Sequence, residues 1–190
     1  YGISTSIWFV KKISCFMKKN PQIQIRIIDY QSGSITETNA DVFICPYIHS
    51  LDGFEQKKIK TFSFKIYGSK SYIENNGAPQ DYEDLDNHRL LAFSKELKNP
   101  FNDADSLLHI GREKHKPRKI ILEVSNSRSI LEFVKEGLGI AVIDTDECLD
   151  PELISIFDDK NILNTDSYFI YKKNRTGSKK ITLLREFLEI

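Results

Sequence analysis

The chain has 190 residues, 40% of them hydrophobic, and its 27 lysines and arginines balance its 27 aspartates and glutamates. That length and apolar content allow one large domain or two small ones with an ordinary buried core. A net charge of zero provides no overall positive field, which disfavours direct binding of the chain to nucleic acid or to an anionic membrane.

The cysteines Cys15, Cys45 and Cys148 are far apart and form no C-x-x-C pair. This spacing argues against a zinc ribbon or a redox dithiol and favours reduced thiols. No apolar run approaches the roughly 20 residues of a membrane span, and the first residues lack the basic-then-apolar order of a secretion signal. We therefore expect a cytoplasmic protein with no metal site and no cofactor.

The first elements expected are a short strand at residues 1–3 and a helix from about residue 7 to 19, which ends at Asn20 and Pro21. The helical period places five apolar side chains on one face of this helix, namely Phe9, Val10, Ile13, Phe16 and Met17. Trp8 and Cys15 fall on the opposite, lysine-bearing side, as isolated surface residues or as part of a subunit contact.

Strand patterns follow the helix. Residues 22–30 alternate isoleucine with polar residues, and residues 60–67 alternate in the same way, as half-buried strands do. Residues 41–46 are nearly continuously apolar, which is typical of a strand buried in a parallel sheet, and Pro46 ends it. After a turn-rich interval at residues 68–88, strands are expected at 89–93, 119–124, 140–143 and 167–172, and a last helix at about 179–188. This interleaving predicts α/β layers with parallel sheet.

The most informative stretch is residues 124–143, which has the pattern of a strand, a helix start, a helix, a glycine stop and a second strand. Ser125, Asn126 and Ser127 offer side chains that cap a helix, and the free N–H groups of a first turn attract carboxylate or phosphate. Gly137 supplies the left-handed residue that ends such a helix. Simple capping and ligand binding both fit this pattern.

In their order and spacing, these elements resemble the effector-binding domain of LysR-type transcriptional regulators, and less closely the type 2 periplasmic binding proteins. The likeness covers nearly the whole chain. The segments that carry it are residues 4–6, 16–21, 41–44, 64–72, 84–85, 134–141 and 181–188.

The resemblance implies two Rossmann-like lobes joined by two crossing strands. Lobe one would comprise residues 1–88 together with 168–190, and lobe two residues 89–167. A small polar or anionic metabolite would bind in the cleft between them. DNA would be bound only by a winged helix-turn-helix that precedes residue 1. The resemblance also implies a homo-oligomer, dimer or tetramer. We predict that the helix at residues 7–19, through Trp8 and Cys15, contacts the 128–136 helix of a partner.

The family's effector pocket, carried onto this chain, is lined by the segment before the first helix, the loop after the second strand, the helix start of lobe two and two apolar walls. The residues at these places are Ser4, Thr5, Ser6, Ser32, Ser34, Pro46, Phe93, Ser125, Asn126 and Ser127. One departure concerns residues 31–40, because they are too few for the helix that the family has before the strand at 41–46.

Two other function classes share some of these features. A solute-binding protein of a transporter would have a similar fold and pocket. An enzyme would need a catalytic constellation, but the sequence has no G-x-S-x-G elbow and no H-E-x-x-H pair. The four histidines and the basic runs at residues 112–119 and 175–180 are expected on the surface, the basic runs in exposed turns. We therefore predict a binding domain without catalytic activity.

Overall fold

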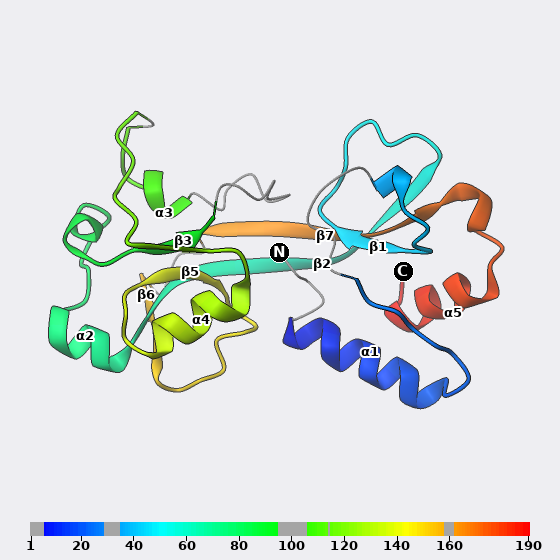
Figure 1. The fold of residues 1–190 in the computed structure, drawn as a ribbon, viewed down its shortest axis with the longest axis horizontal. Coiled ribbons are helices and arrows are strands. Elements are labelled where there is room, and N and C mark those ends of the chain that lie inside the picture. Colours follow the sequence, from blue (N-terminus) through cyan, green and yellow to red (C-terminus); the bar gives the residue numbers. More distant parts are fainter. Residues whose placement is uncertain (1–5, 29–34, 95–105, 114, 158–161) are drawn as a thin grey trace. The chain divides into compact units, whose positions relative to one another are not determined.

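The computed structural model describes residues 6–28, 35–94, 106–113, 115–157 and 162–190 (Figure 1). They form two compact units, each described here by itself. Unit 1 is Ser63–Asn164, and unit 2 is the remainder of the chain up to Phe62 together with Thr165–Ile190. The helices and strands are α1 (Ile7–Lys19), β1 (Phe43–Cys45), β2 (Phe54–Ser69), α2 (Lys70–Asn76), β3 (Leu91–Phe93), α3 (Ser106–His109), β4 (Leu122–Val124), α4 (Ser127–Lys135), β5 (Ala141–Asp144), β6 (Leu153–Ile156), β7 (Leu163–Lys172) and α5 (Lys179–Leu188).

The sheet of unit 1 combines parallel and antiparallel strands. β3 pairs in parallel with β4, and a parallel bridge between Leu90 and Ile140 joins β3 to the start of β5. β2 pairs antiparallel with both β5 and β6. The parallel part is the one that the interleaved helix and strand patterns predict, because parallel neighbours need a crossover between them.

Alternate residues of these strands enter different cores on the two faces of the sheet. On one face, β-strand residues such as Leu91 and Ile143 pack against Ile130, Leu131 and Val134 of α4. The other core joins side chains of the sheet to α2, to α3 and to the turn at 84–87, and its buried members are Ile66, Tyr72, Leu85, Leu90, Leu107, Ile140 and Ile156. Unit 1 is thus a sheet covered on both faces, which explains its apolar strands.

Unit 2 is built on β1, β7 and the first part of β2, with β7 between the other two. β1 pairs antiparallel with β7, so that Cys45 lies opposite Tyr168. Its buried core includes a cluster of Phe169 and Tyr171 from β7 with Ile181 from α5. Helices α1 and α5 meet through the rings of Phe16 and Phe187, whose centroids are 5.3 Å apart.

Helix α1 begins and ends at the predicted residues. Ser6 caps it, because its hydroxyl accepts a hydrogen bond from the N–H of Phe9. Phe9, Ile13 and Phe16 are buried as expected, but Val10 and Met17 are 49% and 40% exposed. The prediction that Val10 and Met17 lie on the buried face was wrong. The face of α1 that the rest of unit 2 covers is narrower than the apolar arc of the sequence.

Other elements also differ from the prediction. Residues 22–28 form no strand, although Ile23 and Ile25 are half-buried, and they have no ladder partner among the described residues. β1 is half-buried and antiparallel rather than a buried parallel strand, although Pro46 does follow its end. Helix α2 and strand β6 lie in segments expected to be irregular. Hydrophobic periodicity in the sequence does not reveal such short elements, since they form through contacts with segments distant in the chain.

β2 and β7 run through both units, as two connecting strands would. The predicted lobe boundaries, after residues 88 and 167, stay a prediction. Within the residues that the structure describes, no helix has the length and apolar character that a membrane span requires.

Candidate functional site

The carboxyl ends of three strands meet at one edge of the unit 1 sheet. Phe93 at the end of β3 lies opposite Val124 at the end of β4, and the N–H of Ser94 donates to the carbonyl of Val124 over 2.8 Å. β5, which follows Ile140 in the same direction, ends at Asp144. Open α/β sheets bind ligands at this edge, outside the carboxyl ends of the strands.

Helix α4 starts at this edge, directly after β4. Asn126 is the N-cap, and its side-chain oxygen accepts the N–H of Ser129 over 2.8 Å. Ser125 is exposed, whereas Ser127, the first residue of the helix, is only 6% exposed. The cap satisfies one of the N–H groups of the first turn, and the helix's own bonds leave the others free for an anion. Gly137, with φ of 73°, ends the helix region as predicted.

Acidic groups lie at the β5 end of the same edge. Asp144 is buried, and one of its oxygens accepts the N–H of Asp146 over 3.1 Å. A turn in which the N–H of Glu147 donates to the carbonyl of Asp144 follows. Burial, with repulsion from Asp144, raises the pKa of Glu147 to about 7, although Arg128 of α4 opposes the shift. No local pattern indicates that Asp144 is buried and Glu147 half-buried, because adjacent acids in a loop are usually solvated.

Unit 2 contains two predicted pocket residues and an aromatic cluster. Ser6 is buried at the start of α1, and Pro46 is half-buried after β1. Beside Pro46, the ring of Tyr47 lies 5.2 Å from the rings of both His49 and Tyr168, between centroids. The side chain of Gln56 accepts from the N–H of Ile48 and donates to its carbonyl, which holds this loop in place.

The sequence and the fold are similar to those of known proteins. The family model of the LysR substrate binding domain matches residues 2–189. The chain belongs to this family. An uncharacterised HTH-type transcriptional regulator of Haemophilus influenzae is 27% identical over 138 residues, which are 71% of this chain and 46% of the relative. The chain therefore spans about half the length of that curated relative.

Two solved structures share the type 2 periplasmic-binding-protein-like fold. The regulatory domain of CrgA, a LysR-type regulator of Neisseria meningitidis, has a TM-score of 0.78 at 17% identity, covering 94% of this chain and 89% of that one. Full-length AphB, the virulence activator of Vibrio cholerae, has a TM-score of 0.74 at 18% identity, covering 98% of this chain and 64% of that one.

In this LysR substrate-binding domain, the predicted site residues fall into three groups. Unit 1 brings Phe93 together with residues 125–127 at one sheet edge. Unit 2 holds Ser6 and Pro46. The predicted positions Ser4, Thr5, Ser32 and Ser34 lie outside the described residues. Across the residues that the structure describes, no group of three or more histidine, cysteine or acidic side chains could hold a metal ion.

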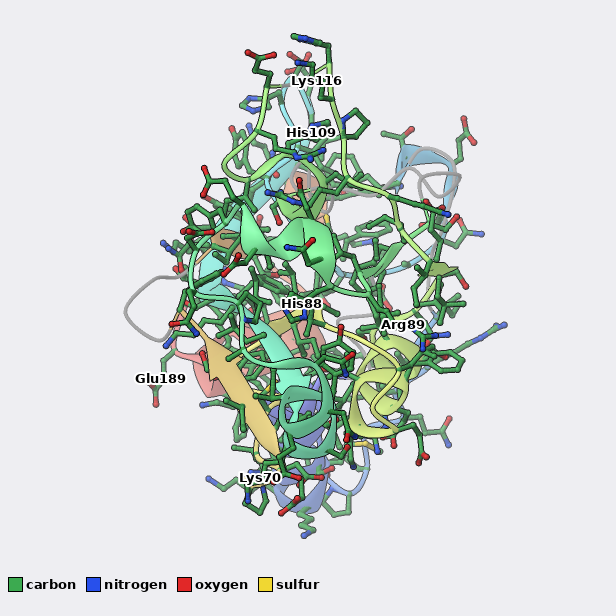
Figure 2. The ribbon with its side chains drawn as sticks, turned by 90° about the vertical axis from the view of Figure 1, so that its left-hand side faces the viewer. Lys70, His88, Arg89, His109, Lys116 and Glu189 are labelled. Carbon is green, nitrogen blue, oxygen red and sulfur yellow. The ribbon has the colours of Figure 1, made fainter. Side chains whose placement is uncertain are left out.

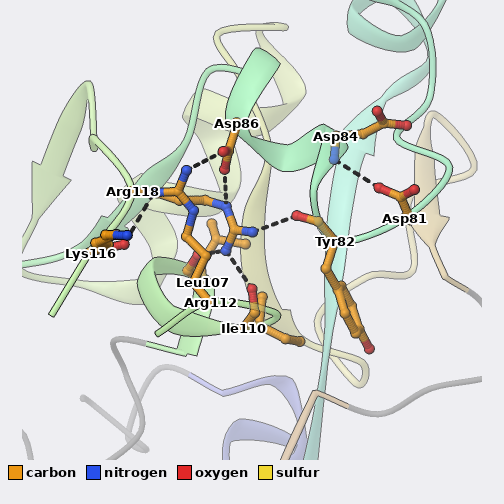
Figure 3. Close-up of polar contacts among 9 residues, drawn as sticks. All are labelled: Asp81, Tyr82, Asp84, Asp86, Leu107, Ile110, Arg112, Lys116 and Arg118. Atoms are coloured by element: carbon orange, nitrogen blue, oxygen red, sulfur yellow. Dashed lines mark hydrogen bonds and ion pairs between the residues drawn. The ribbon is translucent and has the colours of Figure 1, made fainter. Parts of the chain in front are cut away.

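The basic run at residues 112–119 is in part a buried structural network in the LysR domain, and not simply an exposed turn (Figure 3). The side chain of Arg118 is 2% exposed and donates to Asp86 over 2.7 Å. It also donates to the carbonyls of Ile110 over 2.6 Å and Leu107 over 3.2 Å. Arg112 contacts the second oxygen of Asp86. Burial raises the pKa of Asp86, but the hydrogen bonds from both arginines outweigh it and lower the pKa.

His88 is also less exposed than expected. Its Nδ1 lies 3.2 Å from the hydroxyl of Tyr72, which accepts the N–H of Arg89 over 2.9 Å. The direction of the hydrogen bond between this hydroxyl and Nδ1 depends on the tautomer of His88. Burial lowers the pKa of His88, although Asp84 opposes the shift. Figure 2 shows His88 and Arg89 away from His109 and Lys116, so the described histidines of unit 1 do not converge on one centre.

Proposed function

We propose that this chain senses a small anionic metabolite, which unit 1 binds at the N-terminus of α4. The observation that supports this most is the place of that helix start, at the edge where β3, β4 and β5 end. A first turn with free N–H groups, Ser127 beneath it and Phe93 beside it offers both polar and apolar contacts to a small ligand.

The acidic end of the edge favours one orientation of the ligand. Asp144 is a buried carboxyl at the end of β5, and an anionic group placed against it would be repelled. The anionic group therefore belongs at α4, and a neutral or hydrogen-bond-donating part faces Asp144. The contacts that the resemblance assigns to Ser6 and Pro46 of unit 2 remain part of the proposal.

Binding becomes regulation only if the ligand has different affinities for two arrangements of the protein. LysR-type regulators bind small-molecule effectors, contact DNA through an N-terminal domain and form oligomers. We extend this to the whole protein, as a cytoplasmic transcription regulator that binds DNA through such a domain and has no catalytic activity.

A thermal-shift screen with a library of small metabolites tests the proposal. A ligand that binds only the folded state raises the melting temperature, by an amount that grows with its concentration above the dissociation constant. We expect hits among carboxylates, phosphates or sulfates. Ser127→Ala should weaken a hit by about 1.5 kcal/mol, the scale of a hydrogen bond to a charged group.

Ser14→Ala is the matched control for that substitution, because it removes the same hydroxyl from an exposed residue of α1 that is not among the predicted site residues. It should change the affinity much less than Ser127→Ala does. A screen in which only cationic or neutral compounds bind would contradict the anionic effector, and an unchanged affinity of Ser127→Ala would remove Ser127 from the site.

We also propose a contact between subunits that involves α1 and the α4 helix of a partner. Trp8, one of the two residues expected there, is half-buried against Phe62, with ring centroids 6.0 Å apart, whereas Cys15 is exposed. Val10 and Met17 add exposed apolar surface to α1, and Phe133 adds it to α4. Exposed apolar groups on two helices fit burial against a second copy of the chain.

A further inference from the structure

The segment that joins β7 to α5 concentrates positive charge. We call residues 172–180 the β7–α5 loop. It contains no acidic residue and five cationic ones, which are Lys172, Lys173, Arg175, Lys179 and Lys180. The positive and negative charges of the whole chain balance, so the five uncompensated positive charges of this loop call for a physical explanation.

The β7–α5 loop has a defined and open shape. The N–H of Lys173 donates to the carbonyl of Gly53 over 2.9 Å, which ties the loop to the turn before β2. The N–H of Ser178 donates to the carbonyl of Arg175 over 2.9 Å, which closes the turn before α5. A side chain added at Gly177 would meet open space, so the backbone there is accessible to a partner.

None of the five cations forms an ion pair with another residue in the described parts of the chain. The carboxylate of Glu55 accepts a hydrogen bond from the hydroxyl of Tyr171 over 2.6 Å and lies 3.7 Å from the ammonium group of Lys57. Asp52, beside Gly53, makes no ion pair with the described cations either. The positive charges therefore repel one another without compensation from the fold.

The start of α5 adds to this repulsion. Its first turn has Lys179 and Lys180 but no acidic residue, and the side chain of Ser178 makes no capping hydrogen bond. Cations are unfavourable at this end of a helix, where the N–H groups already present positive partial charge. An external anion would relieve both effects.

The composition of the β7–α5 loop indicates which kind of anionic partner fits. Besides its cations, it has only Asn174, Thr176, Gly177 and Ser178. Protein interfaces are rich in aromatic and apolar anchors and poor in lysine, and single-stranded nucleic acid is bound by stacking on aromatic rings. Lysine, arginine, serine, threonine and asparagine are the side chains that contact phosphates of a DNA duplex.

We propose that the β7–α5 loop contacts the phosphate backbone of double-stranded DNA without reading its sequence. This inference rests on the proposed function only in that a DNA-binding domain would hold DNA close to this chain. The contact is additional to that domain's own DNA contacts. It also needs no effector, so its test is independent of whether an effector is found.

The test is fluorescence anisotropy of a labelled duplex of arbitrary sequence, titrated with the 190-residue chain at several low salt concentrations. The loop variant combines Lys173→Gln, Arg175→Gln and Lys179→Gln. The control combines Lys11→Gln, Lys12→Gln and Lys119→Gln, which remove the same charge from cations elsewhere. Melting temperatures by circular dichroism show whether each variant is folded.

We expect the chain to bind the duplex weakly and with a strong salt dependence. The loop variant should lose about tenfold or more in affinity, and its log–log salt slope should be shallower by about 2.7, from three phosphate contacts. The control should lose much less. Absence of binding by the unchanged chain, or equal losses in both variants, would overturn the proposal. Polyglutamate that binds the chain as tightly as the duplex does would also overturn it, in favour of an acidic protein partner.

Discussion

At the scale of single residues, Glu147 connects the candidate site to pH. Burial and the neighbouring Asp144 raise its pKa from 4.5 to about 7. The unfolded chain therefore releases this proton at lower pH than the folded protein does. Folded stability falls as the pH rises from about 4.5 to about 7, and the loss is complete above pH 7.

Glu147→Gln removes this pH dependence, because glutamine stays neutral. We expect the variant to match the unchanged chain near pH 4.5 and to exceed its stability by about 1 kcal/mol near pH 8, after allowance for solvent screening. Urea unfolding across this range measures the difference. His88, whose lowered pKa makes folding less favourable in acid, is present in both proteins and cancels.

The exposed Glu123, changed to glutamine, controls for the loss of a charge as such. Its stability profile should run parallel to that of the unchanged chain. If the stability of Glu147→Gln also changed with pH in parallel with that of the unchanged chain, Glu147 would ionise as an ordinary exposed carboxyl. The account of its burial would then be wrong.

At the scale of elements, Arg118 joins the segment after α3 to the turn at residues 84–87. Replacing it with methionine leaves the carbonyls of Leu107 and Ile110 without their donors and removes the contact with Asp86. We expect a loss of about 3 kcal/mol in the free energy of unfolding, measured with urea.

Arg112→Gln is the matched control, because Arg112 contacts the same Asp86 from a more exposed position. An ion pair with that much exposure contributes less than about 1 kcal/mol. Similar losses in the two variants would show that the carbonyls bound by Arg118 are satisfied in some other way.

Local patterns predicted those elements whose signals are local. The Ser6 cap, the stop at Asn20 and Pro21, and Gly137 with its positive φ all act within one turn, and the helices they delimit are where the sequence places them. Residues 22–28 show the limit of such patterns. They alternate like a strand, but a strand also needs a partner with the right register, and no local feature encodes one.

The candidate site likewise has a part that local sequence patterns predict and a part that they do not. The start of α4 was predictable because capping residues and a glycine stop are written in the sequence. The burial of Asp144 and the half-buried state of Glu147 were not predictable, since both depend on the strands that pack around them. Arg118 likewise looks like part of an exposed basic run in the sequence, whereas in the structure its carbonyl partners come from two separate segments, Leu107 and Ile110 from one and Tyr82 from the other.

At the scale of the whole molecule, the exposed apolar residues of α1 and α4 bear on self-association. Val10 and Phe133 are 49% and 39% exposed. If they lie between subunits, Val10→Glu and Phe133→Glu should each shift the chain toward monomer in sedimentation velocity, because a buried, unpaired carboxylate opposes association.

Leu149→Glu is the control, since Leu149 is more exposed still and lies on neither helix. It should leave the oligomeric state unchanged. A chain that sediments as a monomer at high concentration, or equal effects of all three substitutions, would contradict the proposed contact.

The central claim is that an anionic effector occupies the start of α4, and amide chemical shifts report on that place most directly. The measurement is a proton–nitrogen correlation spectrum of the labelled chain, titrated with a hit from the thermal-shift screen. We predict that the largest shifts fall on the N–H groups of Ser127, Arg128 and Ser129, where the anion would accept hydrogen bonds. Shifts that leave these amides unchanged and gather elsewhere, for example around Tyr47, would contradict the account.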